Sequence, residues 1–582
     1  MANSLFRTKK IESILAEGGD EGHGGGLKRV LTVKDLTFFG IAAIIGAGSF
    51  SSLGEAVFKG GPGVVVLFII TGIACAFTAF CYSEFASRIP VAGSAYTYSY
   101  ASFGEVFAWI IGWALIMEYS IGNIYVAFSW SDYFTSFLHK LNVHIPDFLS
   151  CSYAEAHKAV LNNSPNEELI SAWNTAPMVG GLKIILDLPA LIINFLITIL
   201  VYIGIKESRN FSNIMVILKL AIVALVLIVA GALIFSHGTT FNWTPPNDAG
   251  VHSFMPNGFG GVMAAVSGVF FAYIGFDAVS VLAEESKNPQ RDLPRGMILS
   301  LVICTIVYIL LTLTLTGAVN YRLFEGVGDP LAFIFETGNL NIGWMQLLVS
   351  ICAVIAMTSV LLVFQMGQPR IWMSMSRDGL LPPIFQRIHP KFKTPSFATI
   401  VTGLVVGIPI LFTDKTFVLD FTSIATLFAF VLVCGGVLLI PRKQKVAGRF
   451  NMPHINGQFI YPLLVVLAIT LILVYAKGYF SDAFNFDFSA NEDFQAGKAS
   501  FMDVATPKIS ILLFWGICII LSIVTFFKKY SLIPLMGVTT CLYLLTGMTK
   551  SNWAWFLGWL LIGLVIYFLY GYRKSKLAGS SS

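Results

Sequence analysis

Long apolar segments recur along almost the whole chain, and they constrain its fold more than any other feature. A helix needs about 20 residues to cross roughly 30 Å of hydrocarbon. Fourteen segments of this kind are present, at about 34–56, 63–87, 105–137, 187–206, 212–236, 259–286, 294–318, 343–374, 396–413, 416–440, 459–478, 508–527, 531–549 and 553–572. Only 12% of the 582 residues are charged, about half the share in soluble domains. We predict an all-α polytopic membrane protein with fourteen transmembrane helices surrounded by membrane lipids.

Positive charge is distributed unevenly between the connections. The two tails and the even-numbered connections carry 26 of the 37 Lys and Arg residues, whereas the odd-numbered connections carry 10. Because Lys and Arg accumulate on the cytoplasmic side of a membrane, we expect both termini to be cytoplasmic, with tails at 1–33 and 573–582. This topology accounts for the net charge of +5, and we expect no nucleic-acid partner.

Small residues interrupt the first segment in its middle, at Ile44-Ile45-Gly46-Ala47-Gly48-Ser49-Phe50. A spanning helix satisfies its backbone groups internally, so such a break is tolerated only where the freed groups face a cavity or a ligand. A similar break, Phe270-Phe271-Ala272-Tyr273-Ile274-Gly275-Phe276-Asp277, lies in the sixth segment. The alternative is that glycine is common in membrane helices and lets neighbouring helices pack closely.

Two broken segments five spans apart are typical of an inverted repeat of five plus five helices, with a binding site near the membrane midplane. We therefore predict a core at 34–440, with repeats at about 34–236 and 259–440 and broken helices 1 and 6. Four additional helices would follow at 441–572.

The two breaks would expose opposite backbone groups. Free N–H groups of Ala47, Gly48 and Ser49 would point at an anion, helped by the positive end of the following half-helix. Free carbonyl groups of Phe271, Ala272 and Ile274 would accept from an ammonium group. Together these groups fit an α-amino acid. The candidate substrate-binding residues are Ile44, Ala47, Gly48, Ser49, Phe271, Ala272 and Ile274.

Lys219 lies about two turns inside the fifth segment, too deep to reach the surface easily. An intramembrane charge costs roughly 2.5–3.5 kcal/mol, so it points to a function. Burial disfavours the charged amine, and changes in water access between conformations would load and unload a proton. The alternative is a structural lysine that hydrogen-bonds the carbonyl groups of the first break.

Other residues near the breaks are candidates for the pocket. Glu118, in the third segment, would either face the cavity or act as a hydrogen-bonded strut. Tyr273 and Phe276 flank the second break and would either line the pocket or pack between helices. All eight histidines lie in loops or tails, so we expect no metal site, no cofactor and no enzyme activity.

Several motifs in the same order resemble the amino acid-polyamine-organocation (APC) superfamily and, within it, the cationic amino acid transporter family. They are Gly46-Ala47-Gly48, Cys81-Tyr82-Ser83-Glu84, Gly93-Ser94-Ala95-Tyr96, the Phe271–Asp277 run, Asn288-Pro289-Gln290-Arg291 and Ser376-Arg377-Asp378-Gly379. The resemblance implies alternating access, an amino acid bound between helices 1 and 6, and proton coupling through Lys219. It also places Gln365 at the side-chain pocket, where Gln365 would make the pocket polar.

From these features we expect a secondary active amino acid transporter in the plasma (inner) membrane. Proton-coupled symport is the leading mechanism, with an amino acid and a proton as the transported partners. The alternative is an amino acid exchanger without proton coupling.

Overall fold

The computed structural model describes residues 6–9, 31–46, 48–89, 94–161, 166–204, 209–247, 250–392, 394–439, 449–476, 478–487 and 500–579. Within these ranges the chain is helical apart from its connections and one small antiparallel hairpin of strands β1 (Met178–Val179) and β2 (Leu182–Lys183).

Nine helical segments of the described part are long and apolar enough to cross a membrane. They are Gly48–Arg88, Glu105–Lys140, Asn213–His237, Pro289–Ala318, Gly343–Arg377, Lys415–Leu439, Gly457–Tyr475, Phe501–Lys528 and Lys550–Lys574. Shorter apolar helices are α9 (Leu188–Ile203), α16 (Ser396–Ile410) and α22 (Leu532–Leu545). The prediction of an all-α polytopic membrane protein is therefore confirmed.

The first helix is interrupted at the predicted position. Helix α2 (Val33–Ile44) begins with a capping box between Thr32 and Asp35 and ends at Ile45, whose backbone is extended. The chain becomes helical again in a π-helical turn at Gly48–Ser52, which leads into α3 (Leu53–Gly60).

The second interruption also lies where the sequence predicts it. Helices α11 (Gly258–Ala264) and α12 (Val266–Phe271) end in an irregular stretch, and a 3-10 helix follows at Asp277–Glu285. Within the break Gly275 has a φ of 114°, a conformation that other residues rarely adopt. A Cβ atom at this position would lie 3.0 Å from the Cβ of Ala43 in α2, so glycine also permits the two broken segments to approach.

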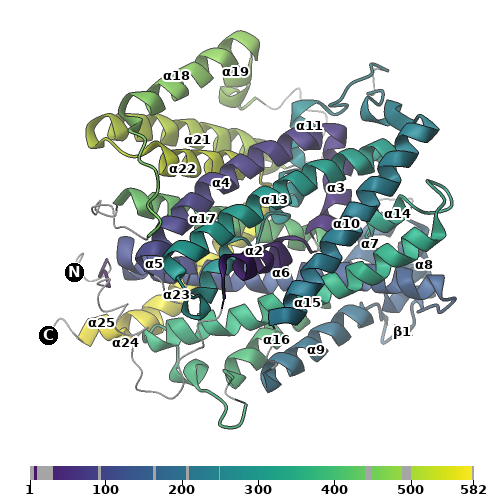
Figure 1. Cartoon of the computed structure of the whole chain (residues 1–582), viewed down its shortest axis with the longest axis horizontal. Coiled ribbons are helices and arrows are strands. Elements are labelled where there is room, and N and C mark those ends of the chain that lie inside the picture. Colours follow the sequence, from purple (N-terminus) through teal and green to yellow (C-terminus); the bar gives the residue numbers. More distant parts are fainter. Residues whose placement is uncertain are drawn as a thin grey trace.

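Long helices from distant parts of the chain enclose the two breaks (Figure 1). Helix α6 (Glu105–Lys140) packs along α15 (Gly343–Arg377) and α17 (Lys415–Leu439). Helix α13 (Pro289–Ala318) packs against α2 and α4 (Val64–Arg88). The first break is therefore held between α13 on one side and α15 on the other, because α2 also contacts α15 and α10 (Arg209–His237).

The C-terminal helices attach to this core on one side. Helix α22 packs against α4 and α17, and α23 (Lys550–Ile566) packs against α6 and α17. Helices α18 (Gly457–Tyr475) and α21 (Phe501–Lys528) pair with each other at the edge of the molecule (Figure 1).

Polar structures occupy the two ends of α6. At its start, the Glu105 amide donates to the Arg7 carbonyl and the Ser575 hydroxyl to the Glu105 carboxylate, so both described chain ends lie at this face. At its other end are α7 (Tyr153–Leu161), α8 (Glu167–Thr175) and the β-hairpin.

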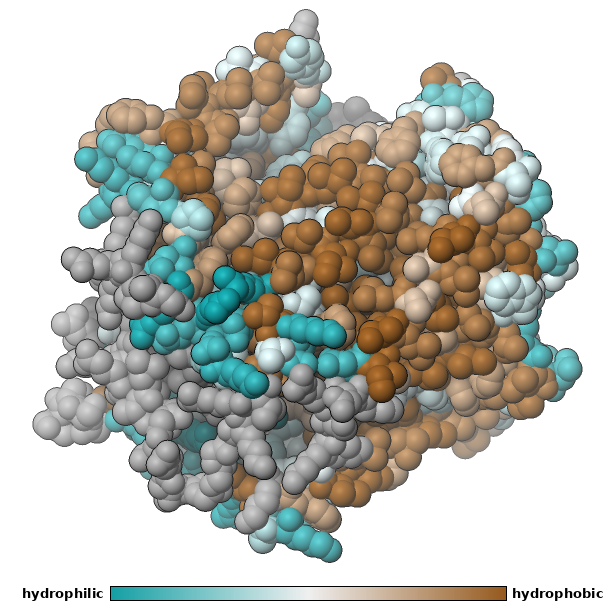
Figure 2. Space-filling view, viewed as in Figure 1, coloured by the Kyte–Doolittle hydropathy of each residue, from teal (hydrophilic) through white to brown (hydrophobic). Residues whose placement is uncertain are grey.

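A broad hydrophobic surface lies between the two polar ends (Figure 2). Large apolar side chains are exposed on it, such as Ile214 at 61% and Phe235 at 71% on α10. Patches of this size on a soluble protein would promote association, whereas lipid covers them in a membrane protein.

Candidate binding site between the two helix breaks

The two breaks touch each other through their backbones. A Cβ atom on Gly48 would lie 2.6 Å from the Cα of Ala272, and a Cβ atom on Gly46 would lie 2.5 Å from a methyl carbon of Val360 in α15. Both distances are too short for a real side chain, so these glycines are what allow the first break to meet the second break and α15.

A tyrosine of α13 bridges the two breaks. The Tyr308 hydroxyl lies 2.9 Å from the carbonyl oxygen of Ile44 and 2.7 Å from that of Ala272. A hydroxyl has one hydrogen to donate, so the two carbonyl groups share it. Sequence reasoning did not find Tyr308, because a single tyrosine in a long apolar helix carries no distinguishing spacing.

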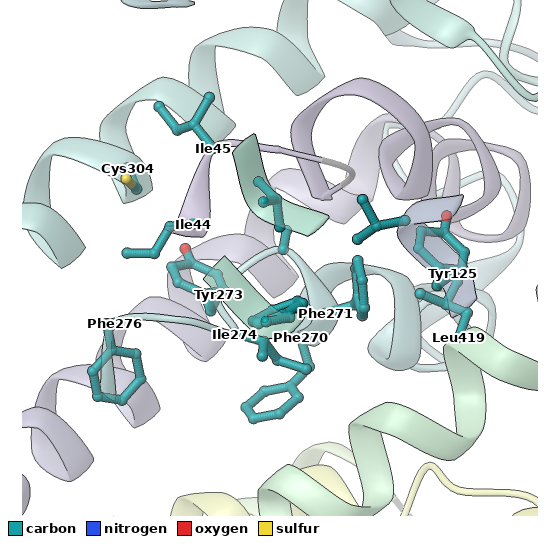
Figure 3. Close-up of a cluster of buried hydrophobic side chains, with 14 of the residues drawn as sticks. Ile44, Ile45, Tyr125, Phe270, Phe271, Tyr273, Ile274, Phe276, Cys304 and Leu419 are labelled. Atoms are coloured by element: carbon teal, nitrogen blue, oxygen red, sulfur yellow. The ribbon is translucent and has the colours of Figure 1, made fainter. Parts of the chain in front are cut away.

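A small cavity of about 10 Å³ lies at this meeting point, lined by Ala43, Ile44, Gly48, Val126, Phe271, Ile274, Val360 and Phe364. It has room for about one water molecule. Four predicted substrate-binding residues are therefore in its wall: Ile44, Gly48, Phe271 and Ile274. Figure 3 shows Ile44, Phe271 and Ile274 within the buried cluster of hydrophobic side chains around the two breaks.

The other three predicted binding residues are near the cavity or undescribed. Ser49 and Ala272 are fully buried and adjoin residues of the cavity wall. Ala47 lies outside the described residues. Sequence reasoning did not select Val126 or Val360, because valine in an apolar helix gives no signal that it faces a site.

Several polar backbone groups of the breaks bond within the protein. The Ser49 amide donates to the Gly46 carbonyl at 3.0 Å, and the Phe271 carbonyl accepts from the Ile274 amide at 3.1 Å. The Ala272 carbonyl is an acceptor in the tyrosine bridge. A bound ligand would use the second lone pair of these carbonyl groups or replace the existing bonds.

Lys219 of α10 lies directly behind the first break. Its Nζ atom donates to the Ser359 hydroxyl at 2.7 Å and to the carbonyl groups of Ala42 and Ile45 at 3.3 Å, and the residue is 2% exposed. The structure therefore brings the amine to the end of α2. This position is compatible with both alternatives, a proton carrier and a structural donor.

Gln365 of α15 is turned away from the cavity. Its carbonyl oxygen accepts from the Asn123 amide at 2.6 Å, and its own amide donates to the Thr198 hydroxyl at 2.9 Å. Gln365 therefore links α15 to α6 and α9 and does not belong to the cavity wall.

Tyr273 and Phe276 are buried between helices. The Tyr273 hydroxyl donates to the Phe68 carbonyl of α4 at 2.8 Å. The Phe276 ring packs against Tyr82 and Phe430, at centroid distances of 6.0 and 5.2 Å. Figure 3 shows Phe276 on the far side of the break from Tyr125. Neither residue belongs to the cavity wall.

Glu118 of α6 is 4% exposed and lies close enough to Asp277 and Thr426 to interact with them. Its Oε2 atom makes no hydrogen bond within the described part of the chain. Glu118 is thus a neighbour of the second break but not part of the cavity wall.

A second, larger cavity of about 680 Å³ opens beside α7 and α8, and we call it the vestibule. Its wall includes Asp132 of α6, Glu155 of α7, Asp329 and Lys415. Lys415, at the start of α17, forms an ion pair with Asp132 and lies 5.6 Å from the centre of the Tyr125 ring.

Aromatic rings separate the vestibule from the small cavity. Tyr125 lines the vestibule, Phe271 lines the small cavity, and their ring centroids are 4.5 Å apart in an edge-to-face arrangement. A ligand moving from one cavity to the other would have to displace this pair.

Asp329 in the vestibule has an unusual acidity. Burial, together with the charges of Glu336 and Asp132, raises the pKa of Asp329 to about 7, against opposing effects of Ser136 and Lys415. One of its carboxylate oxygens has no hydrogen-bond partner within the described residues, so no donor stabilises the charged form at that atom.

Two family profiles match the sequence. The profile of the amino acid permease family covers residues 31–490, and a profile of the C-terminus of amino acid permeases covers residues 530–575. The chain belongs to the amino acid permease family. Both breaks and every residue of the small cavity lie within the first match.

Curated relatives of this permease are transporters. The branched-chain amino acid permease BcaP of Bacillus subtilis (strain 168) is 36% identical over 577 residues, which cover 99% of this chain and 100% of the relative. The methylthioribose transporter of the same organism is 38% identical over 455 residues, covering 78% of this chain and 89% of the relative. The vacuolar cationic amino acid transporter 2 of Arabidopsis thaliana is 31% identical over 637 residues, covering 99% and 94%.

These similarities confirm the resemblance found in the sequence. The permease is a multi-pass membrane transporter of the APC superfamily, and it is not an enzyme.

Proposed function

We propose that this permease carries an α-amino acid across the plasma membrane by alternating access. The observation that carries the proposal is the meeting of the two breaks at Gly48 and Ala272, where the interrupted backbones of both helices adjoin one cavity. Amide groups suit a carboxylate and carbonyl groups suit an ammonium, so the pair recognises the part that all α-amino acids share. Ala47, Gly48 and Ser49 would hold the carboxylate, and Phe271, Ala272 and Ile274 the ammonium.

The proposed architecture has fourteen crossings with both termini in the cytoplasm. Helix α4, the eight other long helices and the three shorter apolar helices supply twelve crossings. The two broken segments, one running from α2 into α3 and the other through α11 and α12, supply one each. Repeats at 34–236 and 259–440 would form the transport core, and helices within 441–572 would surround it. Inverted repeats with broken helices at the midplane are a common transporter design.

Proton coupling through Lys219 is the proposed source of energy. The amine is buried at the end of the first broken half-helix, so a change in its charge would act on the segment that binds the carboxylate. Exchange of one amino acid for another remains the second candidate, since the same cavity would support it without a proton.

Uptake into proteoliposomes tests the coupling. With an inwardly directed proton gradient, we expect empty vesicles to accumulate amino acid above equilibrium, and we expect dissipation of the gradient to abolish accumulation. Lys219→Ala should lose gradient-driven accumulation while retaining exchange in preloaded vesicles. Lys528→Ala, at the end of α21, serves as a control for loss of a lysine and should behave like the wild type.

If the permease is instead an amino acid exchanger, the same assay gives a different pattern. It would show no net uptake into empty vesicles at any pH gradient and full uptake after preloading. Accumulation by Lys219→Ala at the wild-type level would contradict the role of the amine.

The relatives carry branched-chain amino acids, methylthioribose or cationic amino acids, according to their names. Sequence similarity therefore supports a transport function, but it does not identify the side chain of the cargo.

A further inference from the structure

We propose that the cargo is a neutral amino acid with an aliphatic side chain, and that Val126, Val360 and Phe364 contact this side chain once the two breaks move apart and enlarge the cavity, which has room for about one water molecule in the structure described. This inference rests on the proposed function, because it takes the two breaks to bind the α-amino and α-carboxylate groups. It adds the part of the cargo that the breaks do not recognise.

The chemistry of the cavity wall favours an apolar group. The eight residues of the wall are seven apolar residues and Gly48, so its side chains offer no hydrogen bond and no charge. Placing an ammonium or guanidinium side chain there would remove it from water without a partner. An aliphatic side chain would instead gain from leaving water.

Three residues of the cavity wall belong to α6 and α15 and not to the breaks: Val126, Val360 and Phe364. Val360 meets the backbone at Gly46, where its methyl carbon would lie 2.5 Å from an added Cβ. Phe364, four residues later, lies on the same face of α15. Its ring rests 3.3 Å from the Cβ position of Gly122 and packs edge-on against Tyr119, with centroids 5.5 Å apart.

Val126 completes this group, since it lies one turn beyond Gly122 on the same face of α6. The wall is therefore built by apolar contacts between two long helices, and the helices themselves fix the positions of its side chains.

Two polar residues that would suit another cargo lie outside the cavity wall. Gln365 is 1% exposed and is held by Asn123 and Thr198. Glu118 lies eight residues before Val126, about 12 Å along α6, and faces Asp277 and Thr426. Neither side chain supplies a counter-charge to a cationic cargo in the cavity.

A ligand panel tests the cargo directly. We expect isoleucine, leucine and valine to raise the thermal unfolding temperature of the purified full-length permease and to compete with labelled isoleucine for uptake into proteoliposomes. Lysine, arginine and methylthioribose, each at 100-fold excess, should compete at least tenfold less well.

The outcomes separate the two proposals. Stronger competition by lysine or arginine would overturn the aliphatic cargo and leave amino acid transport intact. Binding of methylthioribose with no response to any amino acid would overturn the proposed function itself.

Substitutions at the wall test the three residues. Val360→Phe should raise the KM for isoleucine at least tenfold while alanine, which has a smaller side chain, continues to be transported. Val354→Phe, the same change at a half-buried position of α15 outside the cavity wall, should leave the KM values unchanged.

A variant that removes volume covers the case in which Val360→Phe does not fold. Val360→Ala should shift preference from valine towards the larger phenylalanine by at least threefold. Unchanged preference in every folded Val360 variant would overturn the assignment of this wall.

Discussion

Tyr308 holds together two backbone segments that a bound amino acid would otherwise join. Its hydroxyl is shared between carbonyl groups of the first and second breaks, which are the type of acceptor that an ammonium group needs. In the absence of cargo the tyrosine therefore supplies a donor to a buried, acceptor-rich site. This hydrogen bonding lowers the free energy of the transporter when no cargo is bound.

Replacing Tyr308 tests this role. Tyr308→Phe should lower the stability of the unliganded permease by about 1–3 kcal/mol, because buried carbonyl groups lose their donor. The same variant should show a larger ligand-induced rise in unfolding temperature than the wild type, since the cargo's ammonium restores a donor. Differential scanning fluorimetry with and without isoleucine measures both effects.

Tyr273→Phe is the matched control for this experiment. It removes a buried hydroxyl that donates to Phe68 in α4, away from the cavity, so it should lower stability without enlarging the ligand effect. Equal ligand effects in the two variants would contradict the bridging role of Tyr308.

At the residue scale the sequence revealed backbone features better than side-chain directions. Gly48 and Gly275 mark their breaks because glycine in the middle of an apolar segment is a local signal. Val360 carried no such signal. Gln365 is polar, and its side chain bonds to Asn123 and Thr198. Which face of a helix meets a cavity depends on its neighbours, and a single segment does not contain that information.

At the scale of elements, apolar length predicted the long helices, but the polar connections were less predictable. The connection at 138–186 contains α7, α8 and a hairpin. These short elements owe their order to tertiary contacts such as the ion pair between Lys158 of α7 and Asp414 before α17. Isolated helices of this length are marginal in water.

The connection between α13 and α15 carries a testable pH dependence. The pKa of Asp329 is about 7 in the folded protein, compared with an ordinary value of 3.8. Between these two values the unfolded chain is ionised while the folded protein keeps its proton, so stability falls as the pH rises from about 4 to 7 and changes no further above that range.

Asp329→Asn should remove this fall in stability with rising pH, because asparagine does not titrate. We expect the variant and the wild type to unfold at similar temperatures at pH 4, and the variant to unfold about 2 °C higher at pH 8. Glu325→Gln, at an exposed position of the same connection, is the control. If the difference in unfolding temperature between Asp329→Asn and the wild type does not grow with pH, the raised pKa of Asp329 is contradicted.

For the whole molecule, the fold places both described chain ends at one face and the α7–α8 connection at the other. If the termini are cytoplasmic, a cysteine at Val179, which is 62% exposed, should react with a membrane-impermeant maleimide in intact cells. A cysteine at the exposed Arg573 should react only after permeabilisation. Cys151, which lines the vestibule, is replaced by Ser in both variants. The reverse pattern of labelling would invert the proposed topology.

Lys219 of α10 bonds to the end of α2 and to Ser359 of α15. How many of these hydrogen bonds it can donate depends on how many hydrogens its amine carries. An ammonium has three hydrogens to donate, whereas a neutral amine has two. The three acceptors described around it are the Ala42 and Ile45 carbonyl groups and the Ser359 hydroxyl.

The Ser359 hydroxyl also donates to the Ala356 carbonyl. Loss of one proton from Lys219 would leave two hydrogens for these three described acceptors, two of which belong to the last turn of α2 and the residue that follows it. If Lys219 releases a proton as proposed, the bonds that hold the end of that half-helix would therefore change, and this is where the proposed binding site begins.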